Sequence, residues 1–218
     1  MTRAIVFDLD GTLIDSLPDI THSANALLAE HGQPALPKPQ VAGFVGFGVK
    51  VFMERLIAAT ELRSEDYDAL MTRFMAFYVK ATDHTELYPH VLETLQVLRD
   101  AGYALGLCTN KPGAPMAAVL DAVGLTEFLG ATVAGDTLAL RKPDPAPVRH
   151  AFDLLGATEG VYVGDSIVDA RAAQAARVPF ALFSEGIRVT PLDDVPHDAM
   201  FDDFRQLPDI CQTLIRPL

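Results

Sequence analysis

The chain has 218 residues, half of them hydrophobic, and a formal net charge of −12. This size and composition suit one large domain or one domain with a small insertion. The negative charge argues against a nucleic-acid or anionic-membrane partner. Acidic residues interrupt every apolar run before it reaches the roughly 18 residues of a membrane span.

The two cysteines, Cys108 and Cys211, form no C-x-x-C pattern. This usage fits a reduced compartment better than a disulfide framework. An acid also interrupts the first apolar residues too early for a secretory signal. We therefore expect a cytoplasmic protein.

Short apolar runs recur along the chain, and helical patterns separate most of them. The runs cover residues 4–7, 104–108, 131–134, 161–163 and 180–183. Apolar residues with helical spacing occupy 91–98, 116–123, 148–155 and 167–178. Alternation of strands and helices is typical of a doubly wound parallel sheet with right-handed crossovers. We predict an α/β fold with a Rossmann-like core.

One block breaks this alternation, because residues 16 to about 82 contain helical patterns only. We predict an all-helical cap domain over residues 16–85, inserted into a core formed by residues 1–15 and 86–218. Doubly wound sheets bind their ligands at the carboxyl edge of the sheet. An insertion directly after the first strand would lie over this edge as a lid.

Polar residues follow four of the apolar runs directly or within a short loop. Because the carboxyl ends of parallel strands share one edge of the sheet, these residues should converge. The converging residues are Asp8, Asp10, Gly11 and Thr12 after the first run, Thr109, Asn110 and Lys111 after the second, Lys142 after the third, and Asp165 and Asp169 after the fourth.

The residue types in this set suit phosphoryl transfer. Asp8 and Asp165 offer the hard oxygen ligands that Mg²⁺ prefers, and a cation would relieve the repulsion between neighbouring acids. Asp8 can act as a nucleophile at phosphorus, and Asp10 as the acid and base that serves the leaving oxygen. Asp169 lies one helical turn after Asp165, so both can face the site.

Four further residues can contact the phosphate. Gly11 has no side chain, so the backbone can approach a phosphate closely. Thr109 and Asn110 can donate hydrogen bonds to phosphoryl oxygens, and Lys142 adds a positive charge against the negative transition state.

These motifs resemble the haloacid dehalogenase superfamily of phosphotransferases, and within it the phosphoglycolate phosphatase group. The matching stretches are D-L-D-G-T-L-I-D-S, T-N-K, K-P-D-P and G-D-S-x-x-D, and the helical insertion looks like the cap of that family. The resemblance implies Mg²⁺ held by Asp8, the Asp10 backbone carbonyl and Asp165, with an aspartyl-phosphate formed on Asp8. The dehalogenase branch lacks an acid at the position of Asp10, so the chain resembles the phosphatases.

One departure from the family lies inside the fourth motif, where Ile167 and Val168 stand at positions that are often polar in relatives. The metal ligand is untouched by this difference, but a helper role for the intervening side chains is put in doubt.

The substrate prediction depends on the cap stretch F-V-G-F-G-V-K. Gly46 and Gly48 free the backbone just before a predicted helix, whose N-terminus favours an anion, and Lys50 follows in its first turn. The alternative interpretation of this stretch is a tight turn that binds no anion, with Lys50 in solvent. Resembling phosphoglycolate phosphatases carry a Gly-x-Gly stretch here, which favours 2-phosphoglycolate, a small phosphorylated metabolite, as the substrate.

Other functions remain open at this point. A phosphomutase or a pyrophosphatase or nucleotide phosphatase of the same superfamily would share the core motifs. A phospho-accepting signalling receiver also uses acids, a threonine and a lysine on a parallel sheet, but it has no cap and about half this length. The residues do not predict an oligomeric state.

Overall fold

A parallel sheet with helices on both faces forms the core of the computed structural model, which describes residues 2–217. Six parallel strands follow the order β5-β4-β1-β6-β7-β8, and β9 pairs antiparallel with the start of β6. The strands are β1 (Arg3–Phe7), β4 (Ala104–Cys108), β5 (Ala131–Val133), β6 (Glu159–Gly164), β7 (Phe180–Phe183), β8 (Ala199–Phe201) and β9 (Arg216–Pro217).

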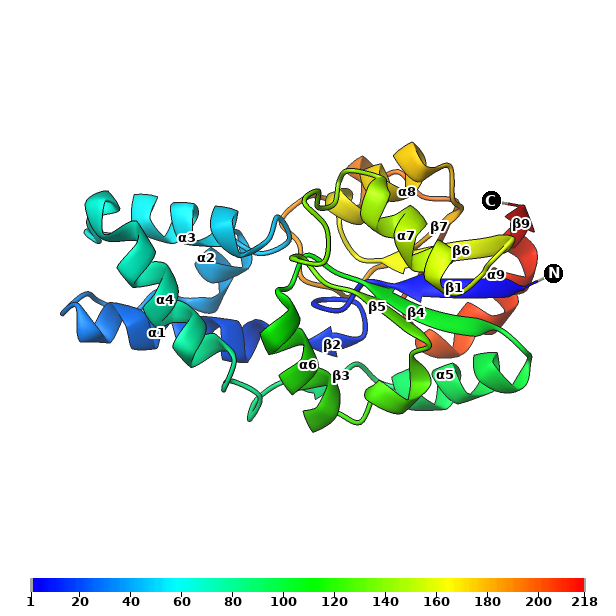
Figure 1. The fold of residues 1–218 in the computed structure, drawn as a ribbon, viewed down its shortest axis with the longest axis horizontal. Coiled ribbons are helices and arrows are strands. Elements are labelled where there is room, and N and C mark those ends of the chain that lie inside the picture. The colour runs from blue at the N-terminus through cyan, green and yellow to red at the C-terminus, as the bar shows by residue number, and fades with distance from the viewer. Residues whose placement is uncertain (1, 218) are drawn as a thin grey trace.

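Alternation along the central strand β1 separates two hydrophobic cores. Ile5 and Phe7 pack on one face of the sheet with α5, α6 and α9, whereas Ala4 and Val6 pack on the other face with α7 and α8. Figure 1 shows α5 and α6 below the sheet and α7 and α8 above it. The helices are α5 (Val91–Asp100), α6 (Gly113–Ala122), α7 (Ala146–Leu154), α8 (Ile167–Ala176) and α9 (Leu207–Leu214). The predicted doubly wound fold is confirmed.

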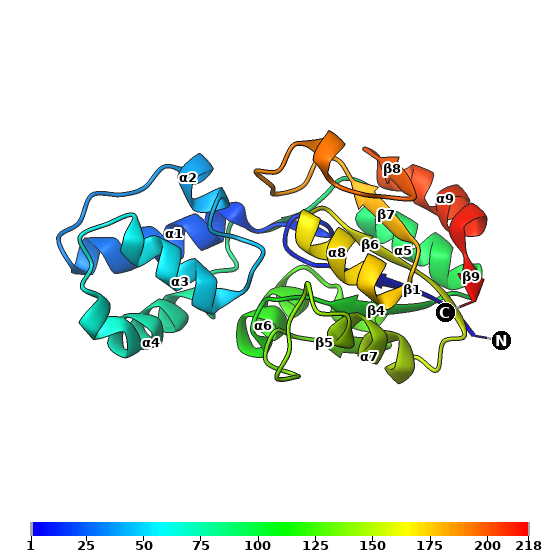
Figure 2. The ribbon, with the colours of Figure 1, turned by 90° about the horizontal axis from the view of Figure 1, so that it is seen from above.

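Four helices form a cap with a hydrophobic cluster of its own. They are α1 (Leu17–Glu30), α2 (Lys38–Ala42), α3 (Val49–Ala58) and α4 (Tyr67–Tyr78). A row of aromatic rings runs through this cluster, from Phe52 to Phe74 with centroids 5.1 Å apart and from Phe74 to Tyr78 with centroids 5.3 Å apart. Figure 2 shows the cap as a separate group of helices beyond one end of the sheet.

A two-stranded antiparallel ribbon, which the sequence patterns did not predict, joins the cap to the core. Its strands are β2 (Ile14–Asp15) and β3 (Glu86–Leu87). Next to it, the buried carboxylate of Asp19 accepts hydrogen bonds from the His84 backbone N–H (3.0 Å) and the Thr85 hydroxyl (2.7 Å). The two chain segments that cross between cap and core are therefore held side by side.

Short 3₁₀ turns complete the described elements, at Ser64–Asp66, Thr126–Phe128, Leu192–Asp194 and Phe204–Gln206. Within residues 2–217, no helix has both the length and the apolar character needed to cross a membrane.

Candidate active site

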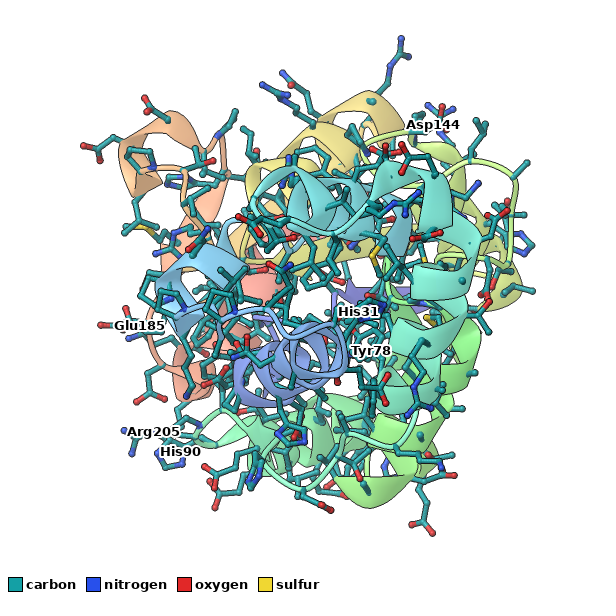
Figure 3. All side chains as sticks on the ribbon, turned by 90° about the vertical axis from the view of Figure 1, so that its left-hand side faces the viewer. His31, Tyr78, His90, Asp144, Glu185 and Arg205 are labelled. Atoms are coloured by element: carbon teal, nitrogen blue, oxygen red, sulfur yellow. The ribbon has the colours of Figure 1, made fainter. Side chains whose placement is uncertain are left out.

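The loops after β1 and β4 meet the cap at a cavity of about 50 Å³. Asp8, Asp10, Thr109, Asn110, Lys111 and Pro112 line it from the core, and Ile20, Val45, Gly46, Gly48, Val49, Phe52, Phe74 and Tyr78 line it from the cap side. Figure 3 looks onto the cap end, where Tyr78 lies near the middle of the view while Arg205 and Glu185 lie toward its edge. The cavity thus joins residues from both parts of the chain.

Asp8 follows the last residue of β1, and its backbone N–H donates a hydrogen bond to the Val163 carbonyl of β6 (2.8 Å). Its Oδ1 lies 2.9 Å from Lys142 Nζ and forms an ion pair with it. The angles at these two atoms are outside the range of a hydrogen bond, and this oxygen has no other partner among the described residues. Burial raises the pKa of Asp8 to about 7, and Asp169 adds to the rise against the opposing charge of Lys142.

Asp165, after β6, is the second buried acid with an unpartnered oxygen. Its Oδ1 accepts a weak hydrogen bond from the Thr12 hydroxyl (3.3 Å), while Oδ2 has no partner within the described chain. Burial, reinforced by Asp169 and Asp8, raises the pKa of Asp165 well above its ordinary value. The protein therefore does little to stabilise a negative charge at this carboxylate.

Asp169 is the third member of the acidic group, and one ligand oxygen from each of Asp8, Asp165 and Asp169 lies within 4.8 Å of the other two. Both Asp169 oxygens are occupied. Oδ1 accepts from Lys142 Nζ (2.7 Å) and lies within hydrogen-bond distance of the Tyr162 hydroxyl (3.1 Å), and Oδ2 accepts from the backbone N–H and the hydroxyl of Ser166. Ser166 caps α8, and together with Asp169 it forms a capping box.

This arrangement fits a hard divalent cation on two counts. Within the acidic group, Asp165 Oδ2 has no partner in the described chain and Asp8 Oδ1 has only its ion pair with Lys142, whereas Asp169 is already committed to Lys142, Tyr162 and Ser166. Burying crowded carboxylates with so few hydrogen bonds is costly, and a cation among them would reduce that cost. Carboxylate oxygens are the ligands that Mg²⁺ prefers. Asp8 and Asp165 can therefore hold such an ion directly, with Asp169 behind them.

Lys142 is buried beside these acids. Its Nζ donates to Asp169 and to the Tyr162 hydroxyl (2.8 Å), and Tyr162 in turn donates to the Cys108 carbonyl (2.9 Å) or to Asp169. Burial opposes the charged form of Lys142, but the nearby Asp169 and Asp8 outweigh it and raise its pKa. The ammonium therefore stays charged next to Asp8.

Asp10 lies on the cavity wall beside Asp8. Its Oδ1 accepts hydrogen bonds from the Ser16 hydroxyl (2.5 Å) and from Lys111 Nζ (2.9 Å). These two contacts hold the Asp10 side chain in one place.

Thr109 and Asn110 both line the cavity, but they are used differently. Both amide hydrogens of Asn110 are engaged, one by the Gly46 carbonyl of the cap and one by the Lys142 carbonyl, each at 2.9 Å. Its Oδ1 also accepts from the Lys142 backbone N–H (3.0 Å). The Asn110 side chain therefore positions the Lys142 backbone and contacts the cap loop, and in this arrangement it has no N–H left for a phosphate. The Thr109 hydroxyl accepts from the Lys111 backbone N–H (3.2 Å), which leaves its proton free.

Gly11 turns the chain beside Asp165 with a φ of +86°, a conformation that favours glycine. A Cβ at this position would lie 2.4 Å from Asp165 Oδ2 and 2.8 Å from the Ile187 backbone nitrogen. Any other residue would displace the acid that fits the cation, so the glycine is required for the geometry of the site.

The three cap residues predicted to govern specificity do not all reach the cavity. Gly46 and Gly48 line it, and Gly48 precedes the first turn of α3. Lys50 is exposed on α3 and is not among the lining residues.

The structure adds two functional candidates that the sequence analysis did not single out. Tyr162 lies in the middle of β6 and is indistinguishable in sequence from a core aromatic residue. Tyr78 ends a cap helix, where its spacing also predicts a core residue. Its hydroxyl accepts a hydrogen bond from Lys111 Nζ (2.7 Å), which lies over the Tyr78 ring at 4.4 Å from its centroid.

A Rossmann-like sheet, a helical cap and carboxylates from two strand ends together define a hydrolase of the haloacid dehalogenase type. Residues 5–183 match the family model described as haloacid dehalogenase-like hydrolase, and the chain belongs to this family.

Relatives and solved structures agree with this assignment. The chain is 42% identical over 217 residues to a phosphoglycolate phosphatase of Cereibacter sphaeroides, covering 97% of this chain and 98% of that protein. It is 44% identical over 188 residues to the plasmid phosphoglycolate phosphatase of Cupriavidus necator, covering 84% and 81%. The crystal structure of a predicted phosphoglycolate phosphatase from Haemophilus somnus 129PT superimposes with a TM-score of 0.89 at 31% identity, covering 96% and 97%.

Proposed function

We propose that the chain is a Mg²⁺-dependent phosphoric monoester hydrolase that converts 2-phosphoglycolate to glycolate and phosphate. The observation that carries this proposal is that Asp8 and Asp10 share the wall of one small cavity beneath the cap. The relatives at 42% and 44% identity, both phosphoglycolate phosphatases, support the choice of substrate.

In this proposal Asp8, Asp165 and the Asp10 backbone carbonyl hold the Mg²⁺. When bound, the ion withdraws negative charge from the phosphoryl oxygens and from the crowded carboxylates. Asp169 keeps Lys142 beside Asp8, where its charge opposes the negative charge of the transferred group. Thr109 and the Gly11 backbone contact the phosphate, and Asn110 acts through its contacts with Lys142 and Gly46.

The reaction then proceeds in two displacements. A carboxylate oxygen of Asp8 attacks phosphorus, the bond to the ester oxygen breaks, and Asp10 gives its proton to the departing glycolate oxygen. A water molecule next attacks the phosphorus of the aspartyl-phosphate, and Asp10 takes a proton from it. The bond between phosphorus and the Asp8 oxygen breaks, and both acids return to their starting states.

The cavity is small, about 50 Å³, and Asp8 itself lines it. The phosphate group and the leaving group of any candidate ester would both have to fit beside Asp8, so even 2-phosphoglycolate requires the cap to lie further from the core than it does here. The choice of 2-phosphoglycolate over the substrates of a phosphomutase or a nucleotide phosphatase therefore rests on the relatives.

Two further predictions are kept as part of this proposal. Residues 16–85 act as the cap domain, and residues 1–15 and 86–218 as the catalytic core. The cytoplasmic location indicated by the two unpaired cysteines stays a prediction.

The test is a panel of phosphomonoesters and pyrophosphate assayed for phosphate release with Mg²⁺. We expect the highest kcat/KM for 2-phosphoglycolate, with stoichiometric glycolate. A higher kcat/KM for pyrophosphate or a nucleotide would reassign the substrate within the family. An isomerised sugar phosphate without free phosphate would indicate a mutase, and one phosphorylation per chain without turnover would indicate a signalling receiver.

A further inference from the structure

We propose that Lys111 of the core and Tyr78 of the cap form a subsite for a carboxylate on the substrate. This subsite would make the enzyme prefer phosphate esters that carry a carboxylate two bonds from the ester oxygen. The inference rests on the proposed phosphatase function and adds to it the residues that recognise the second charged group.

Position is the first argument. Among the described residues that line the cavity, Lys111 is the only basic one. Lys142 is committed to Asp8, Asp169 and Tyr162 and does not line the cavity. Because the chain carries a net charge of −12, an anionic group entering the cavity needs a local positive charge. Lys111 supplies it.

Hydrogen-bond capacity is the second argument. An ammonium group donates three hydrogen bonds, and Lys111 Nζ spends two of them on Asp10 Oδ1 (2.9 Å) and the Tyr78 hydroxyl (2.7 Å). The Tyr78 oxygen acts as the acceptor in that contact, so its own proton is available. One N–H from the core and one O–H from the cap therefore remain for an acceptor, and a carboxylate accepts both.

Burial is the third argument. The Lys111 side chain is only 3% exposed. It forms an ion pair with Asp10 Oδ1 at 2.9 Å and a hydrogen bond with the Tyr78 hydroxyl at 2.7 Å. A charged group held in a site with little water interacts more strongly with an anion than it would in bulk solvent. The contact with Asp10 also places the subsite next to the group that would protonate the leaving oxygen.

The subsite also connects substrate recognition to the position of the cap. Tyr78 is the last residue of α4 and packs on Phe74 in the aromatic row of the cap, whereas Lys111 follows β4. Cap and core are already joined here by the hydrogen bond from Lys111 to the Tyr78 hydroxyl. A carboxylate bound by both side chains would add a second connection between them, which a substrate without a carboxylate would not provide.

The experiment compares 2-phosphoglycolate with ethyl phosphate, which keeps the ester and the first carbon but lacks the carboxylate. The variants are Tyr78→Phe, which removes one hydroxyl and keeps the ring, and Lys111→Met. The matched controls are Tyr67→Phe, at the other end of α4, and Lys80→Met, an exposed lysine near the same helix end. The measured quantity is the ratio of kcat/KM for the two substrates, with Mg²⁺ present.

We expect the wild-type enzyme to prefer 2-phosphoglycolate by at least about 10-fold, since hydrogen bonds to charged groups contribute roughly 10- to 100-fold each. Tyr78→Phe should lower this ratio by about 10-fold and Lys111→Met by at least as much, chiefly through KM. Both controls should keep the wild-type ratio. Lys111→Met also removes a contact with Asp10 and could lower turnover for both substrates. Such a general loss cancels in the ratio of the two kcat/KM values, so the ratio reports only the recognition of the carboxylate.

Binding without turnover gives a second measurement. Calorimetry should show that 3-phosphonopropionate, an uncleavable analogue with the carboxylate, binds more tightly than propylphosphonate, and that Tyr78→Phe and Lys111→Met remove the difference. An unchanged substrate ratio and unchanged binding difference in both variants, or a wild type without any preference, would overturn the subsite. Wild type that binds the carboxylate analogue selectively but hydrolyses neither ester would instead overturn the proposed phosphatase function.

Discussion

The two walls of the cavity differ in chemistry. The core wall is mostly polar and consists of Asp8, Asp10, Thr109, Asn110, Lys111 and Pro112. The cap wall is apolar except for the Tyr78 hydroxyl and the backbone at Gly46 and Gly48. The charged groups thus lie at the end of the sheet, and the mostly apolar groups lie on a separate set of helices.

This difference suggests a division of labour. Substitutions on the core wall should lower turnover whatever fits beside the phosphate, because they remove groups that act on the phosphoryl centre; for Asp10 the size of the loss should depend on the leaving group. Substitutions on the cap wall should change the ratio between substrates, because they alter what fits beside that centre. Lys111 and Tyr78 lie where the two walls meet. Substitutions of these two residues should therefore change both the turnover and the ratio between substrates.

The largest effect is expected from Asp8→Asn. An amide is a poor nucleophile and a weaker metal ligand, so we expect loss of about 10⁴-fold or more in kcat with every substrate. The change is nearly isosteric and removes one of three crowded acids, so the fold should survive. Phosphate release gives the rate and circular dichroism gives the folded fraction. Substantial turnover by the folded variant would exclude Asp8 as the nucleophile.

Removal of the metal should also affect all substrates. Chelation should abolish activity, and Mg²⁺ should restore it. Because binding to the folded state stabilises it, saturating Mg²⁺ should raise the melting temperature by about 5 °C. Asp165→Asn should reduce that rise, since it removes a carboxylate with an unpartnered buried oxygen. Activity that is indifferent to chelator would contradict the assignment of the acidic group to a cation.

Asp10→Asn should separate substrates by their leaving groups. General acid catalysis contributes about 10²- to 10⁴-fold, so we expect a loss in that range for 2-phosphoglycolate. An aryl phosphate, whose leaving group needs no proton, should lose much less. Steady-state rates on both esters measure the contrast. Equal losses would mean that Asp10 acts mainly through the metal or the loop.

The smallest effect is expected from the cap loop. Gly48 has a φ of +86° and lies close to the core, where a Cβ would be 3.5 Å from the Asn110 carbonyl oxygen. Gly48→Val should lower kcat/KM for 2-phosphoglycolate by about 10-fold, which corresponds to roughly 1–2 kcal/mol of backbone strain at the cavity. Hydrolysis of an aryl phosphate, whose leaving group carries no carboxylate, should change less.

Gly32→Val is the matched control for that variant. Gly32 also has a positive φ, of +65°, but a Cβ there would have no neighbour within 4 Å. The two variants should lose similar stability in thermal unfolding, and only Gly48→Val should change the substrate ratio. Equal substrate ratios in the two variants would show that the cap loop does not determine substrate specificity.

Local patterns were sufficient to predict the fold and the edge at which the site lies. The alternation of Ala4 and Val6 with Ile5 and Phe7 places apolar residues on both faces of β1, which is a property of a strand buried in a parallel sheet. Parallel strands end at a common edge, so the convergence of Asp8 and Asp165 follows from the order of strands and helices alone.

Only the tertiary structure decided which hydrogen-bond donors and acceptors of each polar group remain free. Asn110 was predicted to contact phosphate, yet its amide is used by Lys142 and Gly46, because hydrogen-bond partners from other segments compete for the same donors. The sequence predicted Asp165 and not Asp169 as a metal ligand, and the structure adds the contacts: Asp165 keeps an oxygen without a partner among the described residues, while both oxygens of Asp169 accept hydrogen bonds. Tyr78 and Lys111, 33 residues apart, meet because the cap folds back onto the end of β4. The periodicity of apolar residues in the sequence indicates which residues are buried. The hydrogen-bond partners of buried polar atoms, in contrast, depend on contacts between distant segments that form only in the folded chain.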